Sequence, residues 1–143
     1  MFQPEREKAD PKSFEQVKVN DLLPTTIEAV QYEEAHAFKG FQGKADTIQP
    51  GVRFKFLIDG YKFPKYSRWM KFNYSEKSNL YSKYLKPLVE GILPDAKFDI
   101  DNLINLRVKT LWKQNGDFQN LELIVPEDKA LPYTDKQSEP LPF

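Results

Sequence analysis

Apolar and polar residues alternate in three short runs within the first half of this chain of 143 residues. The clearest run, 52–58, carries only apolar side chains on one face, with Arg53 and Lys55 on the other. A period of two residues is typical of a half-buried β-strand. The same pattern predicts strands over 27–36 and 68–74.

The phase of the third run decides which of its rings are available at the surface. Met70, Phe72 and Tyr74 alternate with Trp69 and Lys71. Successive side chains of a strand point to opposite faces. We therefore expect the first three to face the core and the last two to face outward.

A helix follows the third strand, because apolar side chains recur at helical spacing between residues 80 and 88. Ser75 or Ser78 is expected to cap its start. Pro87 is expected to begin a new turn or kink it, and Gly91 to end it.

The last two strands are expected at 105–112 and 118–125, around the turn residues Asn115 and Gly116. This register pairs Thr110 with Leu121. It predicts a core face of Leu106, Val108, Thr110, Leu121, Leu123 and Val125. It predicts an outward face of Arg107, Lys109, Lys113, Phe118 and Glu122.

Three strands, a helix and two more strands form the order of a five-stranded antiparallel OB-fold barrel, with its helix between strands 3 and 4. We assign this mainly β domain to residues 22–126. Residues 1–21 are predicted to be a flexible N-terminal arm. Residues 127–143 are predicted to be a disordered, Pro-rich, acidic tail. An OB-fold binds oligonucleotides or oligosaccharides across the face of strands 2 and 3, together with the loop between strands 1 and 2 and the loop between strands 4 and 5.

The even charge balance conceals a basic segment. The chain has 21 basic and 21 acidic residues, yet residues 51–90 carry 9 basic and 3 acidic side chains. The same segment holds 10 of the 20 aromatic residues. Cations that follow phosphates and rings that stack on bases are what a binder of single-stranded nucleic acid requires. The alternative is a solvated face of Lys residues on an ordinary half-buried sheet.

These patterns select a set of nucleic-acid-binding candidates. Trp69 is the main candidate for base stacking. The full set is Arg53, Lys55, Lys62, Lys65, Tyr66, Arg68, Trp69, Lys71, Lys109, Lys113 and Phe118. Lys109 has a second interpretation as the cross-strand partner of Glu122. Trp112 is expected at the edge of the core.

Composition argues against an enzyme. The chain has no Cys, and this absence excludes a disulfide scaffold and Cys-ligated metal sites. It has a single His, His36, which leaves little for a His-based metal or catalytic centre. P-loop and GxSxG motifs are absent. Asp99 and Asp101 begin a predicted helical turn, where Asp is typical of a cap rather than a metal ligand. We expect no catalytic residue, metal or cofactor.

The stretches GVRFKFLIDGYKFPKYSRWMKF, NLYSKYLKPLVEG and FDIDNLINLRVKTLWKQNGDFQNLELIVP resemble OB-fold single-stranded DNA-binding proteins of bacteria and their viruses, in particular phage- or mobile-element-encoded members. The final Leu141, Pro142 and Phe143 resemble the tip with which bacterial members of this family end. The tip departs from the family pattern, since only Glu139 lies near it where the family has several consecutive Asp residues.

The resemblance implies a protein that coats or protects single-stranded DNA during replication or recombination and recruits partner proteins through its tip. It also implies a cytoplasmic location, in a bacterial cell or virus-infected host. A homo-oligomer is compatible with it. No apolar run long enough to span a membrane is present. The alternatives are an OB-fold module for a protein or glycan, and an RNA-binding protein that uses the same face.

Overall fold

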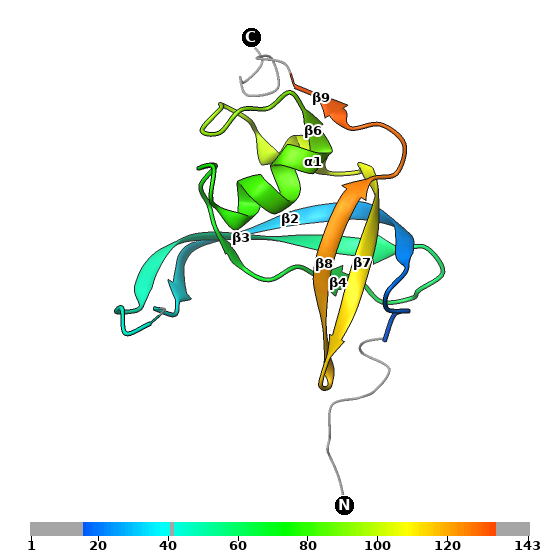
Figure 1. Ribbon diagram of the computed structural model, residues 1–143, viewed down its shortest axis with the longest axis horizontal. Coiled ribbons are helices and arrows are strands. Elements are labelled where there is room, and N and C mark those ends of the chain that lie inside the picture. The colour runs from blue at the N-terminus through cyan, green and yellow to red at the C-terminus, as the bar shows by residue number, and fades with distance from the viewer. Residues whose placement is uncertain (1–15, 41, 134–143) are drawn as a thin grey trace, which may run out of the picture.

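The protein is built mainly from β-strands that form one antiparallel sheet, as the alternating runs predict (Figure 1). The computed structural model describes residues 16–40 and 42–133. The sheet has the order β4-β3-β2-β7-β8, and β5 also pairs with β3. Its strands are β2 (Leu22–Phe38), β3 (Thr47–Ile58), β4 (Lys65–Tyr66), β5 (Met70–Lys71), β7 (Arg107–Asn115) and β8 (Phe118–Pro126).

The sheet is open along one line. Within residues 16–40 and 42–133, no backbone pairing joins β8 to β4 or β5. We call the gap between these edges the seam. The short strands β6 (Val89–Glu90) and β9 (Leu131–Pro132) form a separate parallel pair near the C-terminal end.

The β2–β3 hairpin supplies the centre of the core and extends to one side of the body (Figure 1). The predicted inward face of β3 is confirmed, since Val52, Phe54, Phe56 and Ile58 are all buried. Tyr32 of β2 packs on Phe72, with 5.6 Å between the ring centroids. Phe72 is 40% exposed, so its predicted core position is wrong: β5 ends at Lys71, and the Phe72 ring lies against Tyr32 and Tyr74 at the surface.

The helix lies where the sequence predicts it. It consists of a π-helical part, η2 (Leu80–Leu85), followed by a short α-helix, α1 (Lys86–Leu88). Ser78 caps it, because its Oγ accepts a hydrogen bond from the Tyr81 N–H at 3.1 Å. The winding changes at the turn that contains Pro87, as that residue predicts. A 3-10 turn, η3 (Ile100–Leu103), begins at Asp99, whose carboxylate accepts from the Asp101 N–H.

The register of the last hairpin differs from the prediction. Asn115 pairs with Phe118, so Gly116 is the first turn residue, with φ of 63°. The register shifts again between Leu111 and Trp112, which leaves Glu122 as an extra residue in β8. The bulge reverses the faces that follow it. Leu123, predicted to be core, is therefore 45% exposed, and Ile124 is buried in its place.

The packed part of the chain extends beyond the predicted body at both ends. Val17 is buried. The Val17 backbone N–H donates to the Gln119 side-chain Oε1 at 2.9 Å, and the Gln119 Nε2 donates to the Val17 carbonyl at 2.7 Å. At the other end, the Tyr133 hydroxyl donates to the Lys97 carbonyl at 2.9 Å. Residues 1–15 and 134–143, including the predicted tip Leu141–Phe143, lie outside the described residues. No helix in the described ranges is long and apolar enough to cross a membrane.

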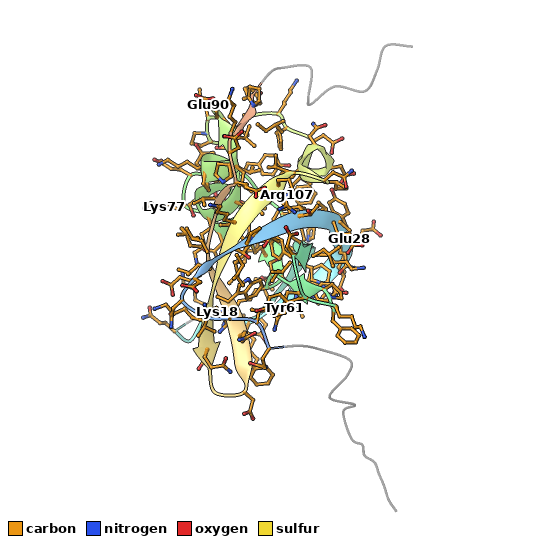
Figure 2. All side chains as sticks on the ribbon, turned by 90° about the vertical axis from the view of Figure 1, so that its right-hand side faces the viewer. Lys18, Glu28, Tyr61, Lys77, Glu90 and Arg107 are labelled. Atoms are coloured by element: carbon orange, nitrogen blue, oxygen red, sulfur yellow. The ribbon has the colours of Figure 1, made fainter. Side chains whose placement is uncertain are left out.

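An ion-pair network around Arg107 ties the ends of β3 and β8 to β7 (Figure 2). Its guanidinium donates to both carboxylate oxygens of Asp59, at 2.9 and 2.7 Å, and to Glu127 at 2.8 Å. The hydrogen bonds from Arg107 lower the pKa of Asp59 and that of Glu127. Arg107 thus holds together segments that meet on the face shown in Figure 2.

This network predicts a pH-dependent effect of Arg107→Met. Because both carboxyls have lowered pKa values in the folded state, their stabilisation is present above their unfolded pKa of about 4 and is lost as the pH falls through the folded values. The variant should therefore be less stable than the wild type at pH 7 and approach it near pH 2. Urea unfolding at both pH values measures this, with Lys97→Met as the control. A difference of equal size at both pH values would contradict the ion-pair role.

Candidate nucleic-acid interface

A break in the third strand positions two of the predicted site residues. Three residues, 67–69, stand opposite two residues of β3, because Lys55 pairs with Tyr66 while Val52 pairs with Met70. The Ser67 hydroxyl fills the gap in the ladder by accepting from the Phe54 N–H at 2.9 Å. Bulges of this kind redirect side chains. Here the bulge interrupts the strand between β4 and β5, in the stretch that carries Arg68 and Trp69.

Trp69 lies in a row of stacked groups on the outward face of β3. The Arg53 guanidinium carbon is 4.3 Å from the centroid of Tyr66 and 4.9 Å from that of Trp69. The indole in turn stacks on His36 at 5.0 Å and 25°, and His36 meets the ring of Phe38 edge-on at 4.7 Å. We call these five side chains the ring column. Its packing fixes Trp69 on the face that the alternation predicts.

Hydrogen bonds hold the ring column in place from β2. Arg53 Nε donates to the Gln31 side chain at 2.7 Å, and His36 Nδ1 lies 2.9 Å from the Glu33 carboxylate. Gly51 leaves the space that His36 needs, because a Cβ there would lie 3.0 Å from the His36 Cβ. The column is therefore a preformed surface, and preformed surfaces bind ligands at lower entropic cost.

A groove runs along the seam beside this column. It consists of three hollows of about 380, 150 and 380 Å³. The first and second share Trp69, Met70 and Asn79, and the second and third share Arg68, Lys83 and Leu121. The shared residues place the three hollows next to one another along the seam, and we call this row of hollows the groove. It leads from Phe38, at the end of β2, to Asn115, at the tip of the β7–β8 hairpin.

The groove is strongly cationic. Its charged lining residues are Arg68, Lys71, Lys77, Lys83, Lys113 and Glu122. The one carboxylate is compensated, since Glu122 lies 3.5 Å from the Lys113 ammonium. Low-dielectric walls lined by one sign of charge concentrate counter-ions of the opposite sign. The groove is thus suited to a chain of negative charges.

Rings and amides complete the lining. Tyr84 forms part of the middle hollow, and burial raises the pKa of its hydroxyl, which keeps the group neutral. The side-chain amides of Asn79 and Asn120 line the groove and make no hydrogen bond within the described ranges. Free amides can donate to and accept from base edges. Phe118, 75% exposed, stands at the tip of the hairpin next to Asn115.

Some of the predicted site residues lie in the groove, some in the ring column and the others outside both. The groove contains Arg68, Trp69, Lys71 and Lys113. The ring column contains Arg53, Tyr66 and Trp69. Lys55 pairs with Tyr66 in the sheet, and its ammonium lies 3.6 Å from Glu28.

Four predicted lysines, Lys55 and three others, are not among the lining residues of the three hollows. Lys62 lies in the loop between β3 and β4. Lys65 has its ammonium 5.8 Å from the centroid of Trp112. Lys109 lies on β7 between Pro24 and Val125, close to the Arg107 network, and the predicted partner Glu122 contacts Lys113 instead. These lysines are therefore separate from the groove.

The structure adds groove residues that sequence reasoning did not select. Lys77, Asn79 and Lys83 come from the helix and the turn before it. Their spacing in the sequence is typical of the solvated face of an amphipathic helix. They line the groove because that helix lies beside the seam. His36 is a further addition, because no pattern in the sequence marks this single histidine as the stacking partner of Trp69.

Within the described ranges, no group of three or more His, Asp and Glu side chains is placed to hold a metal ion. Comparisons of the chain with protein-family models, with curated proteins and with solved structures find no match. The chemistry of the groove itself is therefore what indicates a function.

Proposed function

We propose that the protein is a non-catalytic binder of single-stranded DNA, with the groove and the ring column as its binding surface. The observation that carries this proposal is the groove of three adjacent hollows, lined by five cationic side chains and a single carboxylate that is paired with Lys113. Cations spaced along a groove neutralise successive phosphates, and the rings beside them stack on bases of any sequence.

The arrangement of elements supports an OB-fold interpretation. Three strand segments, a helix and two strands follow each other in the order of that fold. The groove also runs between the two hairpin ends that correspond to the binding loops of OB-folds. The resemblance of the chain to single-stranded DNA-binding proteins adds a role in replication or recombination to the proposal.

The two tryptophans offer a direct test by fluorescence. Trp112 is completely buried, whereas Trp69 lines the groove. Titration with oligo-dT should quench the fluorescence of the wild type, and Trp69→Phe should remove the quenching while retaining most of the affinity, because Phe preserves a stacking ring. Absence of binding at low salt would contradict the proposal. The same titration with oligo-U distinguishes an RNA-binding protein, which would prefer the ribose strand.

A further inference from the structure

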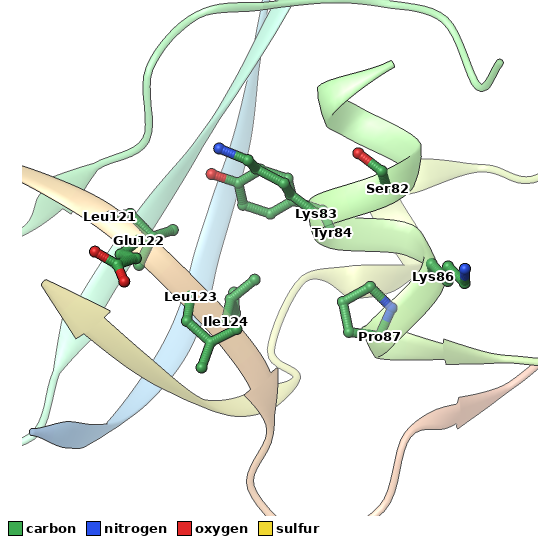
Figure 3. A pocket seen from close by; sticks show the side chains of 9 residues that line it. All are labelled: Ser82, Lys83, Tyr84, Lys86, Pro87, Leu121, Glu122, Leu123 and Ile124. Carbon is green, nitrogen blue, oxygen red and sulfur yellow. The ribbon is translucent and has the colours of Figure 1, made fainter. Parts of the chain in front are cut away.

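A fourth hollow, of about 300 Å³, lies between the helix and β8 (Figure 3). Pro87 on the helix faces Leu123 and Ile124 on the strand. Lys83 and Lys86 also line the hollow. The volume is at the lower end of the range for small-molecule sites. We call this hollow the helix pocket.

The helix pocket continues the groove. It shares Lys83, Leu121 and Glu122 with the third hollow. The pocket and the groove therefore lie next to each other, within reach of one bound strand. Lys83 and Lys86 both line the pocket, and their side chains extend from the helix in different directions (Figure 3). The pocket thus adds a further cation, Lys86, to the line of charges.

One apolar wall of the helix pocket is formed by a side chain that is not part of the buried core. The bulge at Glu122 turns Leu123 outward, and this residue is 45% exposed. Proteins hold a base that has left its stack between aromatic or apolar side chains on the two sides of a pocket. Among polar side chains, the Ser82 hydroxyl already donates to the Ser78 carbonyl at 2.8 Å, and Glu122 pairs with Lys113.

We propose that the helix pocket holds one base of the bound strand, between Pro87 and Leu123, while the adjoining phosphates contact Lys83 and Lys86. This inference depends on the proposed function and extends it by one position of the strand. A base fits the observations better than a side chain of a partner protein, because the pocket borders the cationic groove and shares three lining residues with it. Since the polar lining is already engaged, the pocket selects little between bases.

Scanning an abasic site along the shortest oligo-dT that binds at full affinity tests the inference. For the wild type, one position near an end of the oligonucleotide should lose about five- to a hundredfold in affinity, as expected for one stacked base. In Leu123→Ser, the same abasic position should cost almost nothing, because the wall that contacts the base is gone. Leu93→Ser is the matched control, as Leu93 is 71% exposed and outside the pocket. Lys86→Gln, at an exposed position, provides a second variant and should lower the salt dependence of binding.

The outcomes separate the two proposals. If the wild type binds no oligonucleotide, the proposed function is wrong. If it binds, but each abasic position costs the same in Leu123→Ser as in the wild type, the function stands and the base pocket is overturned. An affinity that Lys86→Gln and Leu123→Ser both leave unchanged at every oligonucleotide length would also overturn it, and would leave the pocket to a partner protein.

Discussion

Replacement of Trp112 by Ala should lower the free energy of unfolding by about 3–5 kcal/mol, the range for removing a fully buried large aromatic side chain. Trp112 is 0% exposed. Its ring meets Phe56 edge-on at 6.1 Å, and its Nε1–H donates to the Thr110 hydroxyl at 2.9 Å. That hydroxyl also pairs with the hydroxyl of Thr25 at 2.8 Å, across β2 and β7. The substitution therefore removes both a core ring and a donor to a buried polar pair.

Urea unfolding of three variants measures this effect. Trp112→Phe keeps a ring in the core and should lose less than Trp112→Ala. Trp69→Ala is the matched control at the other tryptophan and should cost only about 1 kcal/mol, because it removes ring and cation contacts at a half-exposed site. A larger loss at Trp69 than at Trp112 would contradict the division of the two residues between site and core.

The alternation along the chain was sufficient to predict β3 and its buried face, and the apolar stripe to predict the helix. In both elements the inward positions are large and apolar and most outward ones are polar, Leu57 of β3 being an exception, so one phase is clearly favoured. The β7–β8 register was not predictable in the same way. Gly116 suits either of two positions in a tight turn, and the bulge at Glu122 depends on how Trp112 and Ile124 pack inside the core.

The candidate site was predictable in part. The outward phase of the third strand selects Trp69 and Lys71, and both line the groove. Lys77 and Lys83 reach the groove only because the helix lies beside the seam, which no local pattern specifies. Lys109 shows the opposite case, since its outward phase is correct but it lies in the first half of β7, whereas only the end of that strand, with Lys113 and Asn115, lines the groove.

Reversal of two groove charges should weaken binding to oligo-dT about 100-fold at low salt. Arg68 and Lys83 are exposed and both line the second and third hollows. The double variant Arg68→Glu/Lys83→Glu replaces two charge-assisted phosphate contacts by repulsion. At about 1.4 kcal/mol for each position, the loss corresponds to two factors of ten in affinity. The slope of affinity against salt should fall by about 2, since each phosphate contact contributes about 1.

The measurement that tests the central claim most directly is the dissociation constant of oligo-dT for this double variant, compared with Lys97→Glu/Lys129→Glu over a range of salt concentrations. The control makes the same change in net charge at exposed positions that line none of the three groove hollows. If the groove binds the strand, the groove variant loses about 100-fold with a shallower salt dependence, and the control stays close to the wild type. Equal losses in both variants, or full affinity in the groove variant, would contradict the assignment of this groove as the binding surface.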